Sequence, residues 1–378
     1  MRLAYLCAQA LGEDRRARAW HLARCLTRRG HRIILLSPGQ ALKMRCQEVE
    51  GIEMVEAPAS PLRPDYLLYP LVPFFLSRQA ARHGPFDVIH AFDAPLPASG
   101  RTALKLCATG RPLVVDWEED YSQPETARRA GELERRTLAA ARAVVVVSGA
   151  LEERARRLGV SAERLVRIGN GADVSSPRPE RAAARAALGW PADAAIMVCH
   201  VGDSSAPVLA LAALRALLPA HPSLMLALVG EVPREEPSDE LWNWARQQRA
   251  VRRVPPAGAA ELAQYYAAAD LLLLPRRATP AEAARFPLAL GEYLAAGRAV
   301  VASDVGEPGR LLRERLCGVL VQNQEQFTRR IEELLTNAER RARLEQLARH
   351  TAETALDWEN HADTLEALYA RLAEKTKP

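Results

Sequence analysis

The sequence predicts an α/β protein built from two doubly wound domains. Short apolar strands alternate with helical segments in two series, one ending before residue 174 and one starting near residue 195. Strands connected through helices run parallel in one sheet, which is the basis of this fold class. Between the two series, Val174 to Pro179 has the Ser- and Pro-rich composition of a linker. A length of 378 residues also exceeds what a single core usually holds, so two domains are expected.

The chain is mildly basic. Its net charge of +5 and pI near 9.0 suit an anionic ligand or an anionic membrane surface, but they are too mild to indicate nucleic acid. An apolar content of 48% and a charged content of 26% are ordinary for a soluble globular protein.

The six cysteines show no paired spacing, so neither a disulfide framework nor a zinc site is expected, and a cytoplasmic location is predicted. No signal peptide pattern precedes the first strand, and no apolar run reaches the ~20 residues of a membrane-spanning helix.

The first half opens with a β–α–β unit. The apolar segment Leu3–Ala8 predicts a strand, a helix follows from Asp14, and Arg32–Ser37 predicts the next strand. Gly30 ends the helix, since a glycine takes the left-handed conformation at low cost. The loop after the first strand contains Gly12 alone, so the dinucleotide fingerprint G-x-G-x-x-G is missing and a nicotinamide-dependent enzyme is disfavoured.

Residues 62–82 combine apolar and aromatic side chains with flanking arginines. Prolines at 64, 70 and 73 disfavour a regular long helix through this segment. One interpretation is a buried connection that covers the sheet, because apolar runs of this length are usually core. The other is a patch that faces lipid or the acceptor, apolar with a basic rim, which would allow peripheral contact with a membrane.

Polar side chains follow two further strands of the first half. Phe86–His90 predicts a strand with His90 at its carboxyl end, and Leu113–Asp116 predicts another, followed by an acidic segment. Imidazole and carboxylate groups at strand ends are candidates for acceptor binding or proton transfer, although a single histidine there is often only structural. The candidate catalytic residues are His90, Asp116 and Glu118.

The second half repeats the alternation of strands and helices. Its charged C-terminal part, from Glu325 to Leu372, is predicted to be helical. The predicted strands are 195–200, 224–229, 271–275, 299–302 and 318–321.

The segment from Phe286 to Glu307 predicts a helix followed by one of these strands. Gly297 ends the helix, and Glu292 is a charge among its apolar residues. Ligands of open α/β sheets bind outside the carboxyl ends of the strands. Glu292 is therefore a candidate to bind the hydroxyl groups of a ligand.

Taken together, the motifs resemble the GT-B-fold retaining glycosyltransferases of family four. They occur in the family's order over nearly the whole chain. They are Gly30-His31, FDVIH at 86–90, VVVVS at 144–148, IGNGAD at 168–173, LVGE at 228–231, YYAAADLLLLP at 265–275, FPLALGEYLAAG at 286–297, CGVLV at 317–321, DW at 357–358 and LEALY at 365–369.

The resemblance implies two Rossmann-like domains facing across a cleft, with no metal and no cofactor. Residues 1–174 would bind the acceptor, residues 175–355 would bind a nucleotide-sugar, and the helix in 356–378 would pack back on the first domain. By position, Glu292 would hold the donor ribose and Gly202 would meet the diphosphate. The full set of implied donor-binding residues is Gly202, Asp203, Ser204, Gly230, Glu231, Arg285, Phe286, Pro287, Leu290 and Glu292.

The implied donor site also departs from the family pattern. The family's first glutamate falls on Ala284, with Glu282 two residues before it, and a lysine common in this branch falls on Ala289. Residues 203–207, where an arginine and a lysine usually neutralise the diphosphate, are Asp-Ser-Ser-Ala-Pro. A diphosphate leaving group needs positive charge, because negative charge develops on it in the transition state. Candidate replacements close in sequence are Arg276, Arg277, Arg285 and Arg310.

The expected function is that of a retaining hexosyltransferase. It would move a sugar from a nucleotide-sugar to a glycan, lipid or small-molecule acceptor, in the cytoplasm or at the inner membrane face. Because the altered residues are concentrated in the donor site, a non-catalytic relative that acts as a binding or partner-regulating module is the alternative. An epimerase or phosphorylase is less favoured, because no lysine lies between Lys105 and Lys375 to hold a phosphate or a pyridoxal cofactor.

Overall fold

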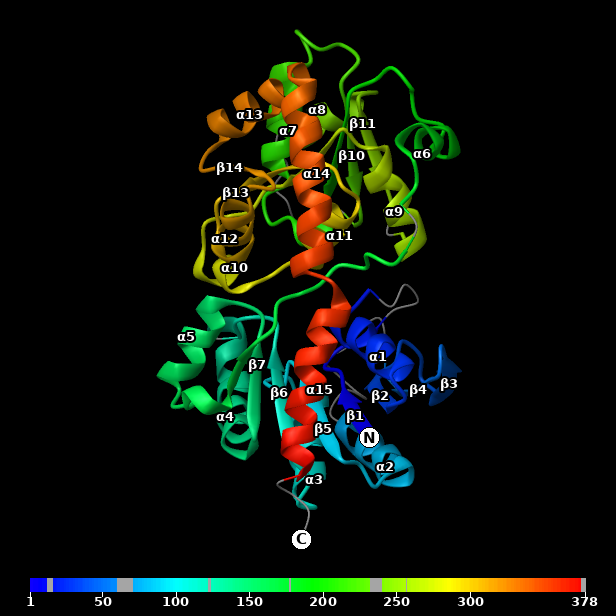
Figure 1. Cartoon of the computed structure of the whole chain (residues 1–378), viewed down its shortest axis with the longest axis vertical. Helices are drawn as coiled ribbons and strands as arrows, with labels where there is room; N and C mark the ends of the chain where they lie inside the picture. Colours follow the sequence, from blue (N-terminus) through cyan, green and yellow to red (C-terminus); the bar gives the residue numbers. More distant parts are fainter. Residues whose placement is uncertain are drawn as a thin grey trace. The chain divides into compact units, whose positions relative to one another are not determined.

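The chain folds into two compact units. The computed structural model describes residues 1–11, 16–59, 71–121, 124–176, 178–231, 240–255 and 257–374. Unit 1 consists of Met1–Gly169 with Trp358–Pro378, and unit 2 consists of Asn170–Asp357 (Figure 1). Each unit contains one sheet with helices around it, so the prediction of two α/β domains is confirmed.

In the described residues, the sheet of unit 1 has eight strands in the order β3-β4-β2-β1-β5-β6-β7-β8. All neighbours pair in parallel except β3 and β4, which are antiparallel. The inner strands are apolar because both of their faces are covered. The strands are β1 (Arg2–Leu6), β2 (Arg32–Pro38), β3 (Arg45–Val49), β4 (Ile52–Ala57), β5 (Val88–Phe92), β6 (Leu113–Trp117), β7 (Ala143–Val146) and β8 (Leu165–Arg167).

The hairpin of β3 and β4 was not expected from the sequence. Its turn consists of Glu50 and Gly51, which have φ values of 50° and 77°. Two consecutive residues with positive φ are typical of the two-residue turns that connect hairpin strands. β3 is largely exposed at the edge of the sheet and carries polar residues, so it lacks the apolar run that revealed the inner strands.

Six described helices belong to unit 1. Helix α2 starts at Val72 with a proline in its first turn, where proline is tolerated because that N–H needs no partner in the helix. Of the segment 62–82, residues 62–70 lie outside the described residues. The helices are α1 (Arg18–Arg28), α2 (Val72–His83), α3 (Pro97–Cys107), α4 (Pro124–Ala140), α5 (Gly149–Arg157) and α15 (Trp358–Glu374).

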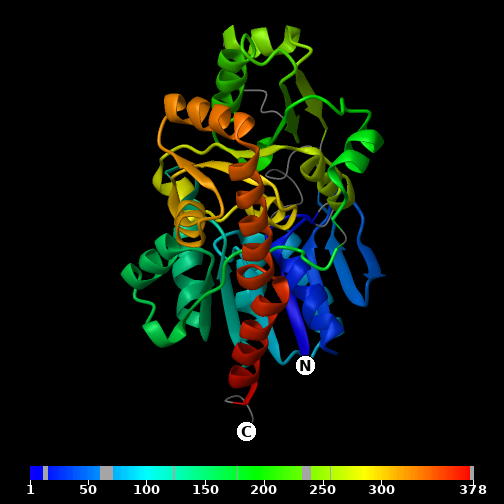
Figure 2. The same cartoon turned by 45° about the horizontal axis from the view of Figure 1, so that its top comes forward.

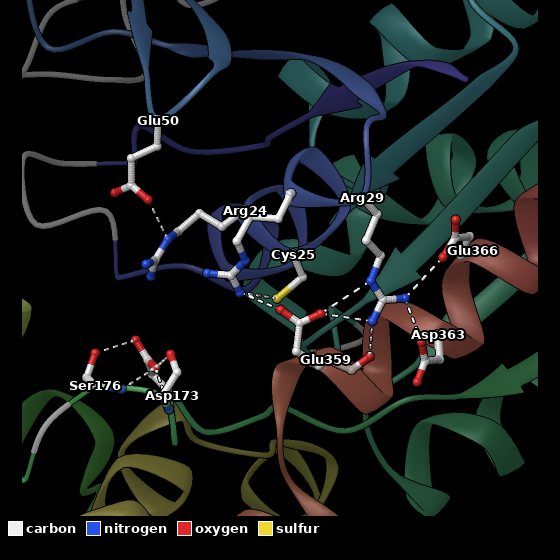
Figure 3. A network of polar contacts seen from close by, with 11 residues as sticks. Arg24, Cys25, Arg29, Glu50, Asp173, Ser176, Glu359, Asp363 and Glu366 are labelled. Atoms are coloured by element: carbon white, nitrogen blue, oxygen red, sulfur yellow. Dashed lines mark hydrogen bonds and ion pairs between the residues drawn. The ribbon is translucent and has the colours of Figure 1, made fainter.

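The C-terminal helix α15 packs on α1 and β5, as expected for a helix that returns to the first domain (Figure 1). Arg29, directly after α1, forms ion pairs with Glu359 at 2.8 Å, Asp363 at 2.6 Å and Glu366 at 3.0 Å, all on α15 (Figure 3). Deeper in the unit, the hydroxyls of Tyr5 and Tyr369 are hydrogen-bonded at 2.9 Å. Exposed ion pairs contribute little individually, so the buried face of α15 supplies most of the stabilisation of this contact.

The described sheet of unit 2 has six strands, all parallel, in the order β11-β10-β9-β12-β13-β14. Strand β11 was not expected, because its two central arginines are exposed and interrupt the apolar pattern. The strands are β9 (Ile196–His200), β10 (Met225–Val229), β11 (Val251–Val254), β12 (Leu271–Leu274), β13 (Ala299–Ser303) and β14 (Val319–Val321).

The helices of unit 2 cover this sheet, and α14 packs along α11 (Figure 2). The C-terminal part that was predicted to be helical consists of α13, α14 and the α15 of unit 1. The helices of unit 2 are α6 (Arg181–Leu188), α7 (Val208–Leu217), α8 (Glu240–Gln247), α9 (Ala259–Ala268), α10 (Pro280–Ala284), α11 (Leu288–Ala295), α12 (Gly306–Arg315), α13 (Gln324–Thr336) and α14 (Ala338–Ala355).

Candidate nucleotide-sugar site in unit 2

The strand order of unit 2 changes direction at β9. Strand β9 pairs with β10 on one side and with β12 on the other, so the helical connections leave in opposite directions from this point. In open α/β sheets, ligands bind at such a switch point, outside the carboxyl ends of the strands. The segments at this position are Val201–Ser205 after β9, Gly230-Glu231 after β10 and Pro275–Arg277 after β12.

The segment after β9 brings two glycines close to an imidazole. A Cβ atom on Gly202 would stand 3.2 Å from Cε1 of His200, and one on Gly230 would stand 3.7 Å from the backbone N of Gly202. Gly230 has a φ of 105°, a conformation that side chains other than glycine rarely adopt. The Nδ1 atom of His200 lies 3.2 Å from Oδ2 of Asp203. The missing side chains leave the backbone accessible to a ligand on this edge.

Helix α11 places Glu292 near the same edge. The hydroxyl of Tyr293, the next residue, accepts a hydrogen bond from the backbone N of His200 at 2.8 Å. The same hydroxyl donates to the carbonyl of Leu273 in β12 at 3.3 Å. Helix α11 is thereby tied to the carboxyl ends of both strands at the switch point. The carboxylate of Glu292 is partly exposed and accepts a hydrogen bond from Tyr266 of α9 at 3.2 Å.

Arg276 is the buried cation of this region. Its guanidinium lies 2.8 Å from Oε2 of Glu282 and donates to the carbonyl of Glu282 at 2.7 Å. Burial lowers the pKa of Arg276, and the nearby carboxylate of Glu282 partly offsets this effect. Glu282 therefore pairs with Arg276, and Ala284, two residues further on, is buried.

The other candidate arginines differ from Arg276 in their surroundings. Arg310 is half-exposed on α12 and pairs with Glu307 and Glu314. Arg277 is exposed, and its backbone N donates to Oγ of Ser205 at 2.9 Å. Arg285 lies 3.5 Å from Glu282. The arginines near the switch point are thus largely engaged with acidic side chains of the protein.

Four of the expected donor-binding residues have buried side chains. Leu290 is fully buried in α11, and Ser204, Phe286 and Pro287 are buried beside the loops. The backbone carbonyl of Phe286 accepts a hydrogen bond from Asn170 at 2.6 Å. Direct ligand contacts through these four side chains do not fit their burial, because residues of the unit already surround them. Gly202 and Glu231 are exposed, and Asp203, Arg285 and Glu292 are partly exposed.

His90 and Asp116, two of the three candidate catalytic residues, are completely buried in unit 1. Oδ2 of Asp116 lies 3.0 Å from Nε of Arg18 and 3.3 Å from Nε2 of His90, and Nδ1 of His90 is bonded to the hydroxyl of Tyr369. Burial lowers the pKa of His90, which keeps the ring neutral. For Asp116, burial opposes ionisation, but Arg18 and His90 lower its pKa overall.

The catalytic expectation for His90 and Asp116 therefore needs correction. Strand β5 runs from Val88 to Phe92, two residues beyond the predicted strand, so His90 lies in the middle of the strand rather than at its end. Both side chains belong to a buried polar network that ties α1 and α15 to the sheet. Such a network supports the fold and leaves neither group able to contact a substrate directly.

Acidic groups do meet at the carboxyl ends of β5 and β6. Oδ1 of Asp93 accepts a hydrogen bond from the backbone N of Glu118 at 3.2 Å, and Asp93 has a φ of 48°. Burial, with the nearby charge of Glu119, raises the pKa of Asp93 to about 7. Burial, with the charge of Asp93, also raises the pKa of Glu118 well above its ordinary value. A carboxyl group with a pKa near neutrality is suited to proton transfer, and Asp93 was not among the candidates proposed from the sequence.

Sequence analysis also missed His200, Tyr266 and Tyr293 of the site in unit 2. The signal for His200 was its place as the last residue of a predicted strand, two residues before Gly202. No sequence signal singled out the two tyrosines, and their hydroxyl contacts reveal their polar role. Over the described residues, no group of three or more His, Cys, Asp or Glu side chains is arranged to hold a metal ion. No helix in that part of the chain has the length and apolarity to cross a membrane.

Two family models match the chain. The model of Glycosyltransferase Family 4 matches residues 17–176, and that of Glycosyl transferases group 1 matches residues 196–337. D-inositol 3-phosphate glycosyltransferase 1 of Catenulispora acidiphila is 31% identical over 320 residues, which are 77% of this chain and 73% of that protein. The D-inositol 3-phosphate glycosyltransferase of Thermobispora bispora is 31% identical over 228 residues, 56% of this chain and 52% of that protein. With most of these curated relatives, the chain aligns to about half of their length.

Solved structures of the same architecture cover almost the whole chain. Sucrose-phosphate synthase from Thermosynechococcus elongatus superposes with a TM-score of 0.78 at 21% identity, covering 98% of this chain and 99% of that one. The Anabaena protein HepE in complex with UDP-glucose has a TM-score of 0.72 at 18% identity, covering 98% and 100%. At these identities, the structural likeness establishes the fold alone. With the family models and the Catenulispora relative, it shows that the chain belongs to glycosyltransferase family 4 and has the GT-B fold.

Proposed function

We propose that this protein transfers a sugar from a nucleotide-sugar donor, bound by unit 2, to a hydroxyl-bearing acceptor. The observation that carries the proposal is the position of Glu292 beside the switch point of the sheet, with its carboxylate bonded to Tyr266 and its helix tied to β9 and β12. A carboxylate there suits the vicinal hydroxyls of a ribose, since it can accept two hydrogen bonds. Support comes from HepE, whose fold is shared and whose solved complexes contain UDP and UDP-glucose.

The sugar is proposed to be a hexose and to be transferred with retention of its anomeric configuration, as the family resemblance implies. The acceptor would be a glycan, a lipid or a small molecule such as a sugar or polyol phosphate. The names of the inositol 3-phosphate glycosyltransferases among the relatives support the last of these. In unit 1, Asp93 and Glu118 are the groups proposed to exchange a proton with the acceptor, because the pKa of Asp93 is raised to about 7 and that of Glu118 is raised well above its ordinary value.

The experiment has a binding arm and a turnover arm. Isothermal titration with UDP, ADP and GDP should reveal one preferred nucleotide, and hydrolysis of the matching nucleotide-sugars should release that nucleotide. Glu292→Gln should weaken binding of the nucleotide at least tenfold, since a hydrogen bond to a charged group is lost at the ribose. Glu339→Gln, an exposed glutamate on α14, is the matched control and should bind like the wild type.

The binding arm and the turnover arm separate the two candidate functions. If no common nucleotide binds the wild type, the proposed donor site in unit 2 is refuted. If a nucleotide binds but no nucleotide-sugar is hydrolysed or transferred to any acceptor, the result favours the non-catalytic relative. The observation behind that alternative is Ala284, which is buried at the position of the family's first glutamate and cannot contact a donor.

We further propose that the protein makes peripheral contact with a membrane through the described part of the segment 62–82. Leu71 and Phe74, before and in the first turn of α2, are exposed by 47% and 53%, which is unusual for large apolar side chains. The Nζ atom of Lys105 on α3 lies 5.8 Å from the centre of the Phe74 ring. Helices α2 and α3 pack together and carry arginine and lysine but no acidic residue. An exposed apolar group within a basic surface suits an anionic lipid headgroup layer.

A further inference from the structure

We infer that His200, positioned by Asp203, binds the diphosphate of the donor. The inference rests on the proposed nucleotide-sugar function and identifies one residue by which the site holds phosphate. His200 is the last residue of β9, at the switch point where a ligand is expected.

The His200 ring lies between Asp203 and two glycines. Its Nδ1 atom lies 3.2 Å from Oδ2 of Asp203, and the backbone N of His200 donates to the hydroxyl of Tyr293. A Cβ atom on Gly202 would stand 3.2 Å from Cε1 and 3.6 Å from Nδ1, and one on Gly230 would stand 3.9 Å from both Cε1 and Nε2. Within the described residues, Nε2 forms no hydrogen bond with the protein, so it is available to a ligand between these glycines.

The pairing also explains an acidic residue that is otherwise unfavourable. An aspartate near a diphosphate repels it, and Asp203 stands in the segment where the family usually provides a cation. Next to His200, the same carboxylate lies 3.2 Å from Nδ1 and orients the ring with Nε2 toward the ligand, as carboxylate–histidine pairs do elsewhere. Asp203 is thus a positioning residue.

Two of the candidate arginines are already paired with acidic side chains of the protein. Arg276 is buried and paired with Glu282, and Arg310 is paired with Glu307 and Glu314. Both guanidiniums are therefore already engaged with carboxylates of unit 2. His200 lies at the switch point, with the Cε1–Nε2 side of its ring near Gly230.

The test is a titration series with decreasing numbers of phosphates. The best-binding diphosphate among UDP, ADP and GDP is compared with its monophosphate and its nucleoside, on the wild type, His200→Gln and Asp203→Asn. We expect His200→Gln to weaken the diphosphate by about tenfold or more and the nucleoside by less than about twofold, because hydrogen bonds to charged groups are the strong ones. His221→Gln, a partly exposed histidine elsewhere in unit 2, is the matched control and should change neither.

Asp203→Asn decides between a positioning role and simple repulsion. If Asp203 orients His200, its replacement weakens binding of the diphosphate severalfold, whereas removal of a merely repulsive carboxylate would give tighter binding. If His200→Gln weakened binding of the diphosphate and of the nucleoside equally, the ring would contact the nucleobase and the inference would be overturned. An unchanged affinity for the diphosphate would also overturn it. Unaltered thermal midpoints show that the variants are folded. Failure of the wild type to bind any nucleotide would instead refute the proposed function itself.

Discussion

The hydroxyl of Tyr266 donates a hydrogen bond to Oε2 of Glu292 at 3.2 Å, and the two side chains come from different helices, α9 and α11. Two rings also meet here, since Tyr266 lies edge-on to Tyr293 at 4.9 Å between centroids. The carboxylate that we assign to the donor ribose is therefore held in one orientation before a ligand arrives. Pre-organisation of this kind lowers the entropy that binding must overcome.

Tyr266→Phe tests this relationship. The variant keeps the ring and removes the hydroxyl, so we expect the preferred nucleoside diphosphate to bind about three- to tenfold more weakly. Its 2′-deoxy analogue should be affected less, because the carboxylate then has one ribose hydroxyl fewer to bind. Tyr265→Phe, whose ring stacks on Trp190 at 5.6 Å, is the matched control and should leave both affinities unchanged. Equal weakening of the two ligands would contradict an action through Glu292.

Gly291 tests how tightly α11 is packed. A Cβ atom at this position would stand 2.2 Å from the carbonyl oxygen of Gly171, a distance that real atoms do not tolerate. Gly291→Ala should therefore destabilise the protein by about 1–3 kcal/mol, measured by urea denaturation. Gly131→Ala in α4 is the matched control, because nothing lies within 4 Å of its added Cβ. The control should be neutral or stabilising by up to ~1 kcal/mol, since alanine favours a helix. A larger loss in the control than in Gly291→Ala would refute this packing.

The buried pair of Arg18 and Asp116 should be essential for stability. Both side chains have no exposed area, and Arg18 also donates to the carbonyl of Gly169 at 2.5 Å. Asp116→Asn leaves the buried guanidinium without its counter-charge, so we expect a loss of about 3–5 kcal/mol in the free energy of unfolding. The pKa of Asp116 is lowered in the folded state, so its contribution is present near neutral pH and disappears as the pH falls through the lowered pKa. Glu153→Gln breaks an exposed pair with Arg157 and should leave the midpoint nearly unchanged.

Phe74 tests the proposed membrane contact. Phe74→Ser should reduce the fraction of protein that sediments with phosphatidylglycerol vesicles, because the exposed ring supplies apolar area that a serine does not. Leu158→Ser, an exposed leucine on unit 1 outside α2 and α3, is the control and should sediment like the wild type. Binding that is equally strong to neutral phosphatidylcholine vesicles, or that is indifferent to Phe74→Ser, would refute the surface proposed here.

The apolar inner strands were predictable from the sequence, whereas the edge strands were not. Strands such as β9 and β12 are buried on both faces and appear as continuous apolar runs. The edge strands β3 and β11 carry exposed polar residues, and their hydrogen bonds to a neighbour leave no mark in the hydrophobic pattern. The inner strands could therefore be predicted from the sequence, whereas the edge strands were identified only in the structure.

The candidate site was only partly predictable for a different reason. Glu292 and Gly202 follow from their positions relative to strand ends, which sequence patterns locate to within about two residues. An error of that size placed His90, which lies in the middle of β5, at the end of the strand. For the same reason Asp93, which directly follows the true end at Phe92, was not proposed. The pairing of Asp203 with His200 depends on side-chain direction in a short loop, and no periodicity encodes this direction.

Asp93 gives the last prediction, in which the sign of a pH effect is tested. Its folded-state pKa is raised to about 7, against an ordinary value near 3.9, so the folded protein favours the protonated carboxyl. The stability that this proton provides is complete below pH ~4 and is lost as the pH rises through about 7. Asp93→Asn removes the titration and keeps an acceptor for the N–H of Glu118, and asparagine tolerates the φ of 48°.

The variant should therefore be more stable than the wild type at pH 8, by about 1–2 kcal/mol, and about equally stable at pH 4. Urea unfolding at the two pH values measures the difference. If Asp93 serves proton transfer to the acceptor, the same variant should also lower kcat while nucleotide binding in unit 2 is unchanged. A gain in stability with full activity would assign the raised pKa to burial alone, and equal stability of the two proteins at pH 8 would refute the raised pKa.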